Sequence, residues 1–167
     1  MRTHDIPIAD AMTEFMKIGW APSPLTGVKP HPSIPFTKIR REKLSKQYPG
    51  SRLIFPSGSL KVRSNDSDYQ FRAHSAFSWF TGIVASDCVP DSLFVMEPTS
   101  AGHEALLFIH PRSPRNDSEF YKDTRFGEFW VGRRMTLEET ETKYGIKVRQ
   151  IESIDEFLKN KKETLLV

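Results

Sequence analysis

The sequence predicts an α/β fold, and three observations along the chain favour it. A helical pattern over 37–48 is followed at once by an apolar run of strand length, Ser51 to Pro56. Two further apolar runs, Leu93 to Glu97 and Glu104 to His110, are separated by a short loop and predict a β-hairpin. A helix, a strand and another helix are then expected between residues 136 and 161.

The N-terminal part predicts a helix followed by a stiff connector. Asp5 can cap a helix that reaches Trp20, with apolar residues at helical spacing. Residues 21–35 contain five prolines and no periodicity, which predicts an extended linker. We expect the helix to pack on this domain; an arm that docks on another subunit is the alternative. The expected division is therefore 1–35, helix and connector, and 36–167, one domain.

Thr37 is the expected N-cap of the second helix. Its residues Ile39, Leu44 and Tyr48 lie near one face, and the basic residues occupy the rest. These are Arg40, Arg41, Lys43 and Lys46. A solvated helix face is the favoured interpretation of these charges, and a phosphate-binding patch is the alternative.

The C-terminal third begins with a capping box, Thr136-x-x-Glu139, and Gly145 is the expected end of that helix. Leu137, Thr140 and Tyr144 are expected to face inward. Residues 146–151 alternate apolar and charged, as a half-buried strand does, and a last helix is expected from Ser153 or Asp155 to Lys161. Residues 164–167 end the chain as an apolar strand, so the chain looks like the front part of a longer polypeptide.

The segment from Asp66 to Gly82 is rich in aromatic residues. It contains five within twelve positions, namely Tyr69, Phe71, Phe77, Trp79 and Phe80. So much aromatic area favours burial. Ser75 is the expected cap of a helical turn on which Phe77 and Phe80 share one side. Tyr69, Phe77, Trp79 and Phe80 are all expected in the core.

Three stretches together carry a family resemblance. Asp66-Ser-Asp-Tyr, Phe71-Arg72 and Ser75-Ala-Phe-Ser-Trp-Phe-Thr-Gly82 resemble the signature of the N-terminal domain of aminopeptidase P (Xaa-Pro aminopeptidase), in the creatinase/prolidase family. Phe36 to Leu44 resembles its opening helix, and Glu128-Phe-Trp-Val-Gly-Arg-Arg134 its aromatic-Gly-Arg-Arg run. The resemblance implies a ribonuclease-H-like, creatinase-type fold, a mixed β-sheet flanked by helices.

The resemblance also implies a function. The chain would be the non-catalytic N-terminal domain of an enzyme that removes the N-terminal residue preceding proline. Two manganese ions would sit in a separate downstream catalytic domain, which this chain lacks, and a homo-oligomer is expected. Trp130 matches a tryptophan that approaches the peptide substrate, and Asp66 matches an acidic residue near it. The alternatives are a core aromatic for Trp130 and a turn residue for Asp66. Arg72, Arg133 and Arg134 are expected in structural ion pairs.

Other classes of function find little support. The five histidines lack metal-ligand spacing, and no catalytic residue or metal ligand is predicted in this chain. A single cysteine, no signal peptide and no membrane-length apolar run favour a cytoplasmic protein without a membrane partner. The net charge of +3 argues only weakly for nucleic acid, which is not an expected partner. A peptide-binding module of a catalytically dead relative and the N-terminal domain of a prolidase remain alternatives.

Overall fold

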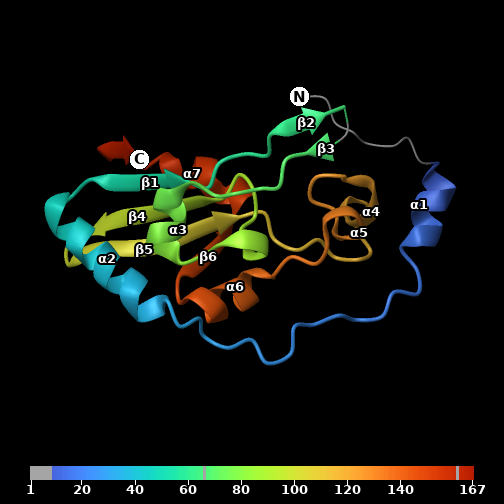
Figure 1. Ribbon diagram of the computed structural model, residues 1–167, viewed down its shortest axis with the longest axis horizontal. Helices are drawn as coiled ribbons and strands as arrows, with labels where there is room; N and C mark the ends of the chain where they lie inside the picture. Colours follow the sequence, from blue (N-terminus) through green and yellow to red (C-terminus); the bar gives the residue numbers. More distant parts are fainter. Residues whose placement is uncertain (1–8, 66, 161) are drawn as a thin grey trace.

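The computed structural model describes residues 9–65, 67–160 and 162–167, and one five-stranded sheet organises it (Figure 1). The strand order is β6-β5-β4-β1-β7. The strands are β1 (Arg52–Pro56), β4 (Leu93–Thr99), β5 (Gly102–Ile109), β6 (Lys147–Gln150) and β7 (Thr164–Leu166). β2 (Val62–Ser64) and β3 (Ser67–Asp68) pair as a separate two-stranded ribbon.

The sheet is mixed, as expected. β4 pairs antiparallel with both β1 and β5, so the predicted hairpin is confirmed. The two outer pairings are parallel, β6 on β5 and β7 on β1. The expected mixed sheet is therefore confirmed.

Helices and single turns surround the sheet. They are α1 (Asp10–Met16), α2 (Ile34–Gln47), α3 (Ser75–Thr81), α4 (Glu119–Lys122), α5 (Glu128–Val131), α6 (Leu137–Tyr144) and α7 (Ile154–Leu158), with 3-10 turns at Ala85–Asp87 and Ile151–Ser153. The capping box predicted for α6 is present, and Gly145 ends that helix in the left-handed conformation.

Side-chain alternation along the strands divides the core into two layers. On β1, Leu53 and Phe55 face a cluster that includes Phe77 of α3 and Tyr144 of α6. Ile54, between them, faces the opposite cluster, against which residues of α7 pack. Both faces of the sheet are therefore covered, which explains why β1 is apolar over successive positions.

α2 begins three residues before the predicted start. Thr37 is not the N-cap, because the helix already runs from Ile34, with Ser33 at the cap and Pro35 in the first turn, where a proline costs no hydrogen bond. Its buried side is only partly the predicted one, because Leu44 packs against the core but Tyr48 is 42% exposed. Thr37 and Arg41 are buried, whereas Ile39 is half exposed. The Arg41 guanidinium donates to the carbonyl of Phe80 at 2.8 Å, so this cation fixes α2 to α3.

The aromatic segment is only partly buried. Phe77 is buried, and Phe80 packs against the same cluster, as predicted. Tyr69 and Trp79 are 59% and 56% exposed, so their prediction as core residues is wrong. Trp79 lies two residues after Phe77 on a helix, which turns it away from the core. The predicted cap is also wrong, because Ser75 is already the first helical residue.

Candidate functional site

Residues 111–134, here called the helical cap, carry the predicted site residue Trp130. They contain α4 and α5, which lie beyond the end of the sheet and beside α1 (Figure 1). The chain turns tightly between these two helices at Gly127. A Cβ there would stand 2.3 Å from the carbonyl oxygen of Asp123 and 2.5 Å from that of Glu119, so only glycine fits.

Glu128 of α5 is the centre of one ion-pair network. Its carboxylate accepts from Nε of Arg112 at 2.6 Å and from Nη2 of Arg115 at 3.0 Å. Burial by itself would raise the pKa of Glu128, but the hydrogen bonds and charges of the two arginines outweigh burial and lower it. Glu128 therefore stays ionised and holds the two arginines against α5.

The same arginines hold the proline-rich connector. Ser23 accepts from Arg112, Arg115 and Arg133, with distances from 2.6 to 3.2 Å. The backbone N–H of Leu25 donates to Glu139 Oε1, which also pairs with Arg133 at 2.6 Å. The connector is thus fixed to the helical cap and to the start of α6 through charged hydrogen bonds.

A second network joins the helical cap to the end of β5. Glu119 Oε1 pairs with Arg134 at 2.9 Å, and its other oxygen contacts Nε2 of His110, also at 2.9 Å. Burial opposes ionisation of Glu119, but hydrogen bonds from Ser113, His110 and Arg134 leave its pKa below the ordinary value. The expected structural ion pairs of Arg133 and Arg134 are therefore present.

Trp130 lies at the surface of the helical cap. Its indole N–H donates to the carbonyl of Tyr121 at 2.7 Å, and its ring meets Phe129 edge-on at 5.7 Å. The side chain remains 44% exposed, so Trp130 is not a core aromatic. One hydrogen bond fixes the orientation of a large ring that still offers area to a ligand.

α1 and the residues after it pack against the helical cap. The Tyr121 hydroxyl donates to the carbonyl of Thr13, and Trp20 meets Phe120 edge-on at 5.0 Å. The predicted apolar face of this helix is not the buried one, because Met12 and Phe15 are 51% and 71% exposed. The predicted cap Asp5 lies outside the described residues.

Asp66 and Arg72 are the remaining residues that the sequence singled out. Asp66 lies outside the described residues. Arg72 is exposed, and it makes no hydrogen bond or ion pair in the described part of the chain, so its predicted structural pairing is wrong. The carboxylates at the centre of the networks, Glu119 and Glu128, were not singled out from the sequence. Arg112 and Arg115, the partners of Glu128, lie in a polar stretch whose sequence predicts only turns.

Arg72 instead lies between two open grooves. One groove, of about 740 Å³, lies between α2, α3 and residues 70–73. The other, of about 430 Å³, lies on the far side of the same residues, toward Gly58 and Lys61. Both have room for a peptide segment.

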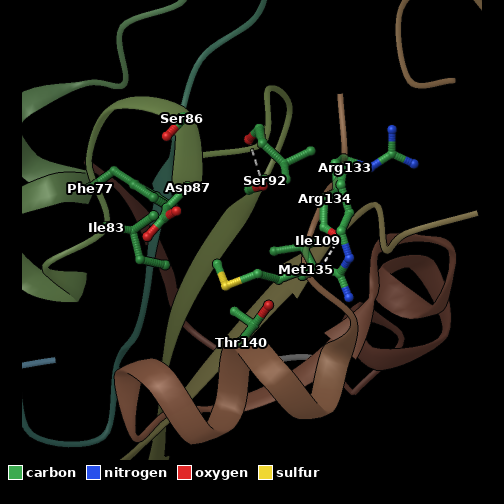
Figure 2. A pocket seen from close by; sticks show the side chains of 11 residues that line it. Phe77, Ile83, Ser86, Asp87, Ser92, Ile109, Arg133, Arg134, Met135 and Thr140 are labelled. Carbon is green, nitrogen blue, oxygen red and sulfur yellow. Dashed lines mark hydrogen bonds between the residues drawn. The ribbon is translucent and has the colours of Figure 1, made fainter. Parts of the chain in front are cut away.

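A smaller cavity lies under α6. Phe77, Asp87, Met135 and Thr140 converge on it (Figure 2). Its volume is about 30 Å³, which is enough for water and too little for a peptide. It therefore belongs to the packing of the domain.

The described residues offer neither a metal centre nor a membrane span. Across 9–65, 67–160 and 162–167, no group of three or more His, Cys, Asp or Glu side chains is placed to hold a metal ion. No helix within these ranges is long and apolar enough to cross a bilayer.

Fold and surface together define an α/β domain with an exposed tryptophan on a cap held by ion pairs. The family model for the N-terminal domain of aminopeptidase P matches residues 37–166. The chain belongs to this family.

Curated relatives and solved structures agree with the family. The chain is 40% identical over 147 residues to Xaa-Pro aminopeptidase 1 of Streptomyces coelicolor, covering 88% of this chain and 29% of that protein. It is 38% identical over 141 residues to Xaa-Pro aminopeptidase 2 of Streptomyces lividans, covering 84% of this chain and 29% of that protein. The chain therefore spans about three tenths of the length of these relatives.

Two solved structures share the fold. Aminopeptidase P from E. coli with the inhibitor Pro-Leu superposes with a TM-score of 0.61 at 25% identity, over 77% of this chain and 26% of that one. Proline aminopeptidase P II from Yersinia pestis gives a TM-score of 0.58 at 26% identity, over 73% of this chain and 25% of that one. In both, the matched region is about a quarter of the longer chain.

Proposed function

We propose that this chain is the non-catalytic N-terminal domain of a manganese-dependent Xaa-Pro aminopeptidase. The parent enzyme would remove the N-terminal residue that precedes a proline, and this domain would shape its substrate entrance and contribute to contacts between subunits. The family match and the names of the relatives support this proposal. A cytoplasmic location stays a prediction from the sequence.

One observation carries the proposed role at the entrance. Trp130 is 44% exposed although its indole N–H is bonded to the Tyr121 carbonyl, so its ring is both oriented and accessible. An indole face packs well against a proline ring or a peptide plane. A solved relative binds Pro-Leu as an inhibitor, which supports a proline-containing peptide as the ligand. Asp66 is proposed as a second contact that would hold a free ammonium group.

The manganese ions are proposed for the downstream part of the parent enzyme. The described residues of this chain provide no cluster of donors that fits such an ion. The proposed contribution of this domain is to bind and orient the peptide.

The test uses the full-length polypeptide with Xaa-Pro peptides. Trp130→Ala should lower kcat/KM by roughly tenfold, because it removes about one aromatic packing interaction, and Trp130→Phe should recover most of the loss. Trp79→Ala is the control, since it removes another exposed indole, 56% against 44% for Trp130, from α3. Equal effects of the two alanine variants, or none from either, would refute the proposed role of Trp130.

The purified chain of 167 residues should not cleave an Xaa-Pro peptide with added manganese. Cleavage that depends on the metal would contradict the assignment as a non-catalytic domain. A full-length polypeptide that binds such peptides without cleaving them would instead indicate the peptide-binding alternative. Cleavage restricted to dipeptides would indicate a prolidase.

A further inference from the structure

The larger of the two surface grooves has a basic and aromatic lining that the proposed peptidase role does not use. Its lining residues come from α2, α3 and the irregular segment before α3. Two of them are arginines, Arg40 and Arg72, and no aspartate or glutamate stands among the described residues that line the groove. Such a one-sided charge distribution favours an anionic ligand.

Both arginines are available to a ligand. Among the described residues, Arg72 makes no hydrogen bond or ion pair. Arg40 donates from Nη1 to the carbonyl of Trp79 at 3.0 Å and forms no ion pair there. Its remaining N–H groups can still donate, because a guanidinium carries five donors. The N–H groups of a guanidinium form a fork that matches the two oxygens of a carboxylate, and this groove holds two such groups.

The aromatic residues of the groove are already oriented. The Arg40 guanidinium carbon lies 3.6 Å from the centre of the Trp79 ring, so the cation is stacked on the indole. Trp79 is nevertheless 56% exposed, and Phe71 is half buried beside it. The stacked arginine covers one face of the indole, and the exposed remainder of the ring stays available to a ligand.

The backbone of the groove wall adds a feature suited to a peptide. Tyr69 and His74 are tied by backbone hydrogen bonds to Lys61 and Ser57, at 2.8 and 2.9 Å. Between them, residues 70–73 form no backbone–backbone hydrogen bond within the described part of the chain. An anchored segment with free N–H and C=O groups can pair with the backbone of another chain.

We propose that this groove binds an acidic peptide segment of a partner protein. The segment would pair with residues 70–73 through its backbone, and its carboxylates would accept from Arg40 and Arg72. Its apolar atoms would pack on Trp79 and Phe71. This binding would be independent of the peptidase role, because Trp130 does not line the groove.

The test titrates the purified chain into a fluorescein-labelled peptide of alternating Glu and Ala, followed by fluorescence anisotropy. The matching Gln–Ala peptide should bind at least about threefold more weakly, because it lacks the charges that the arginines recognise. Affinity for the Glu–Ala peptide should fall as salt rises from about 0.05 M to about 0.5 M.

Alanine variants of the two groove arginines test whether the peptide binds in this groove. Arg72→Ala and Arg40→Ala should each raise the dissociation constant by roughly threefold to tenfold, the range expected for exposed charge pairs. Arg149→Ala is the matched control, because it removes the same charge from an exposed position on β6 and should change the constant by less than about twofold. Circular dichroism of each variant checks that the fold is kept.

Three results would overturn the proposal. The first is no binding of the Glu–Ala peptide at low salt. The second is an equal loss in Arg149→Ala and Arg72→Ala, which would indicate non-specific attraction. The third is tighter binding of an oligothymidylate than of the peptide, which would assign the groove to nucleic acid.

Discussion

The sheet and the helical cap are stabilised by different forces. At the centre of the sheet, Phe94 and Leu107 are fully buried, and apolar burial there is insensitive to pH. Within the helical cap, Glu119 and Glu128 pair with arginines, and Arg112 and Arg115 also donate to Ser23 of the connector. Buried or partly buried ion pairs add little net free energy of folding, but they fix the positions of the groups that they join. The sheet therefore carries the stability of the domain, and the cap fixes the orientation of Trp130.

The largest expected effect on stability comes from truncating one phenylalanine side chain in each region. Phe94→Ala at the sheet centre should lower the free energy of unfolding by about 3–5 kcal/mol, because it leaves a cavity in a closed core. Phe129→Ala in the cap, where the ring is 54% exposed, should cost less than about 1 kcal/mol. Urea unfolding measures both, and equal losses would show that the cap is as much a part of the core as the sheet.

Acid should release the helical cap before the apolar centre of the sheet. Glu97 of β4 pairs with the buried Arg52 and with Lys162, which lower its pKa although burial opposes this, so this one pair of the sheet weakens in acid too. Burial also acts to raise the pKa of Glu119, Glu128 and Glu139. Hydrogen bonds from Ser113, His110 and Arg134 nevertheless lower the pKa of Glu119, and those from Arg112 and Arg115 lower that of Glu128. Hydrogen bonds from Arg133, Thr136 and Leu25 lower the pKa of Glu139 to about 2. A carboxyl with a lowered folded-state pKa contributes stability that is complete above its unfolded value, about 4.3, and is lost as pH falls through the folded value. The loss should therefore occur between about pH 4.5 and about pH 2.

Tryptophan fluorescence can follow this release. In a Trp79→Phe background, the remaining indoles are Trp130 in the cap and Trp20, which packs on Phe120. Glu128→Gln should move the fluorescence change toward neutral pH, and Glu156→Gln, which removes only an exposed pair, should not. A single acid transition shared by fluorescence and far-ultraviolet circular dichroism would contradict a separate cap.

The smallest expected effect concerns the capping box of α6, which follows the helical cap in the chain. Thr136 caps α6, and Glu139 completes the box while also pairing with Arg133. Thr136→Ala should cost about 1 kcal/mol of unfolding free energy. Thr142→Ala, at an exposed position within the same helix, should be neutral or slightly stabilising. Thermal denaturation compares them, and an equal shift would mean that the capping box contributes nothing.

The sequence predicted those parts of the fold that depend on local patterns. The α6 capping box and the β4–β5 hairpin follow from residue spacing along short stretches, and both are present. Trp79 was misplaced because aromatic content was taken as burial, although its offset of two from Phe77 turns it outward. The start of α2 was missed because Pro35 resembles the prolines of the connector and not a first-turn residue.

The site was harder to predict, because its contacts join residues distant in the sequence. Trp130 was identified through the family motif, but nothing in the motif shows that Tyr121 holds its N–H. α4 and α5 have four residues each, too few for a periodic pattern. The pairing of Ser23 with three arginines connects residues about 90 to 110 positions apart, and no local rule anticipates it.

The parallel pairing of β7 with β1 has a mechanical consequence. The N–H of Val167 donates to the carbonyl of Ile54, and that of Arg52 donates to the carbonyl of Glu163, so bonds bracket the pair at both ends. Tension that draws Val167 away from the start of β1 would load all of these bonds together in shear. Such a pair resists pulling far better than a hairpin that opens one bond at a time, so β7 is held stiffly against the sheet.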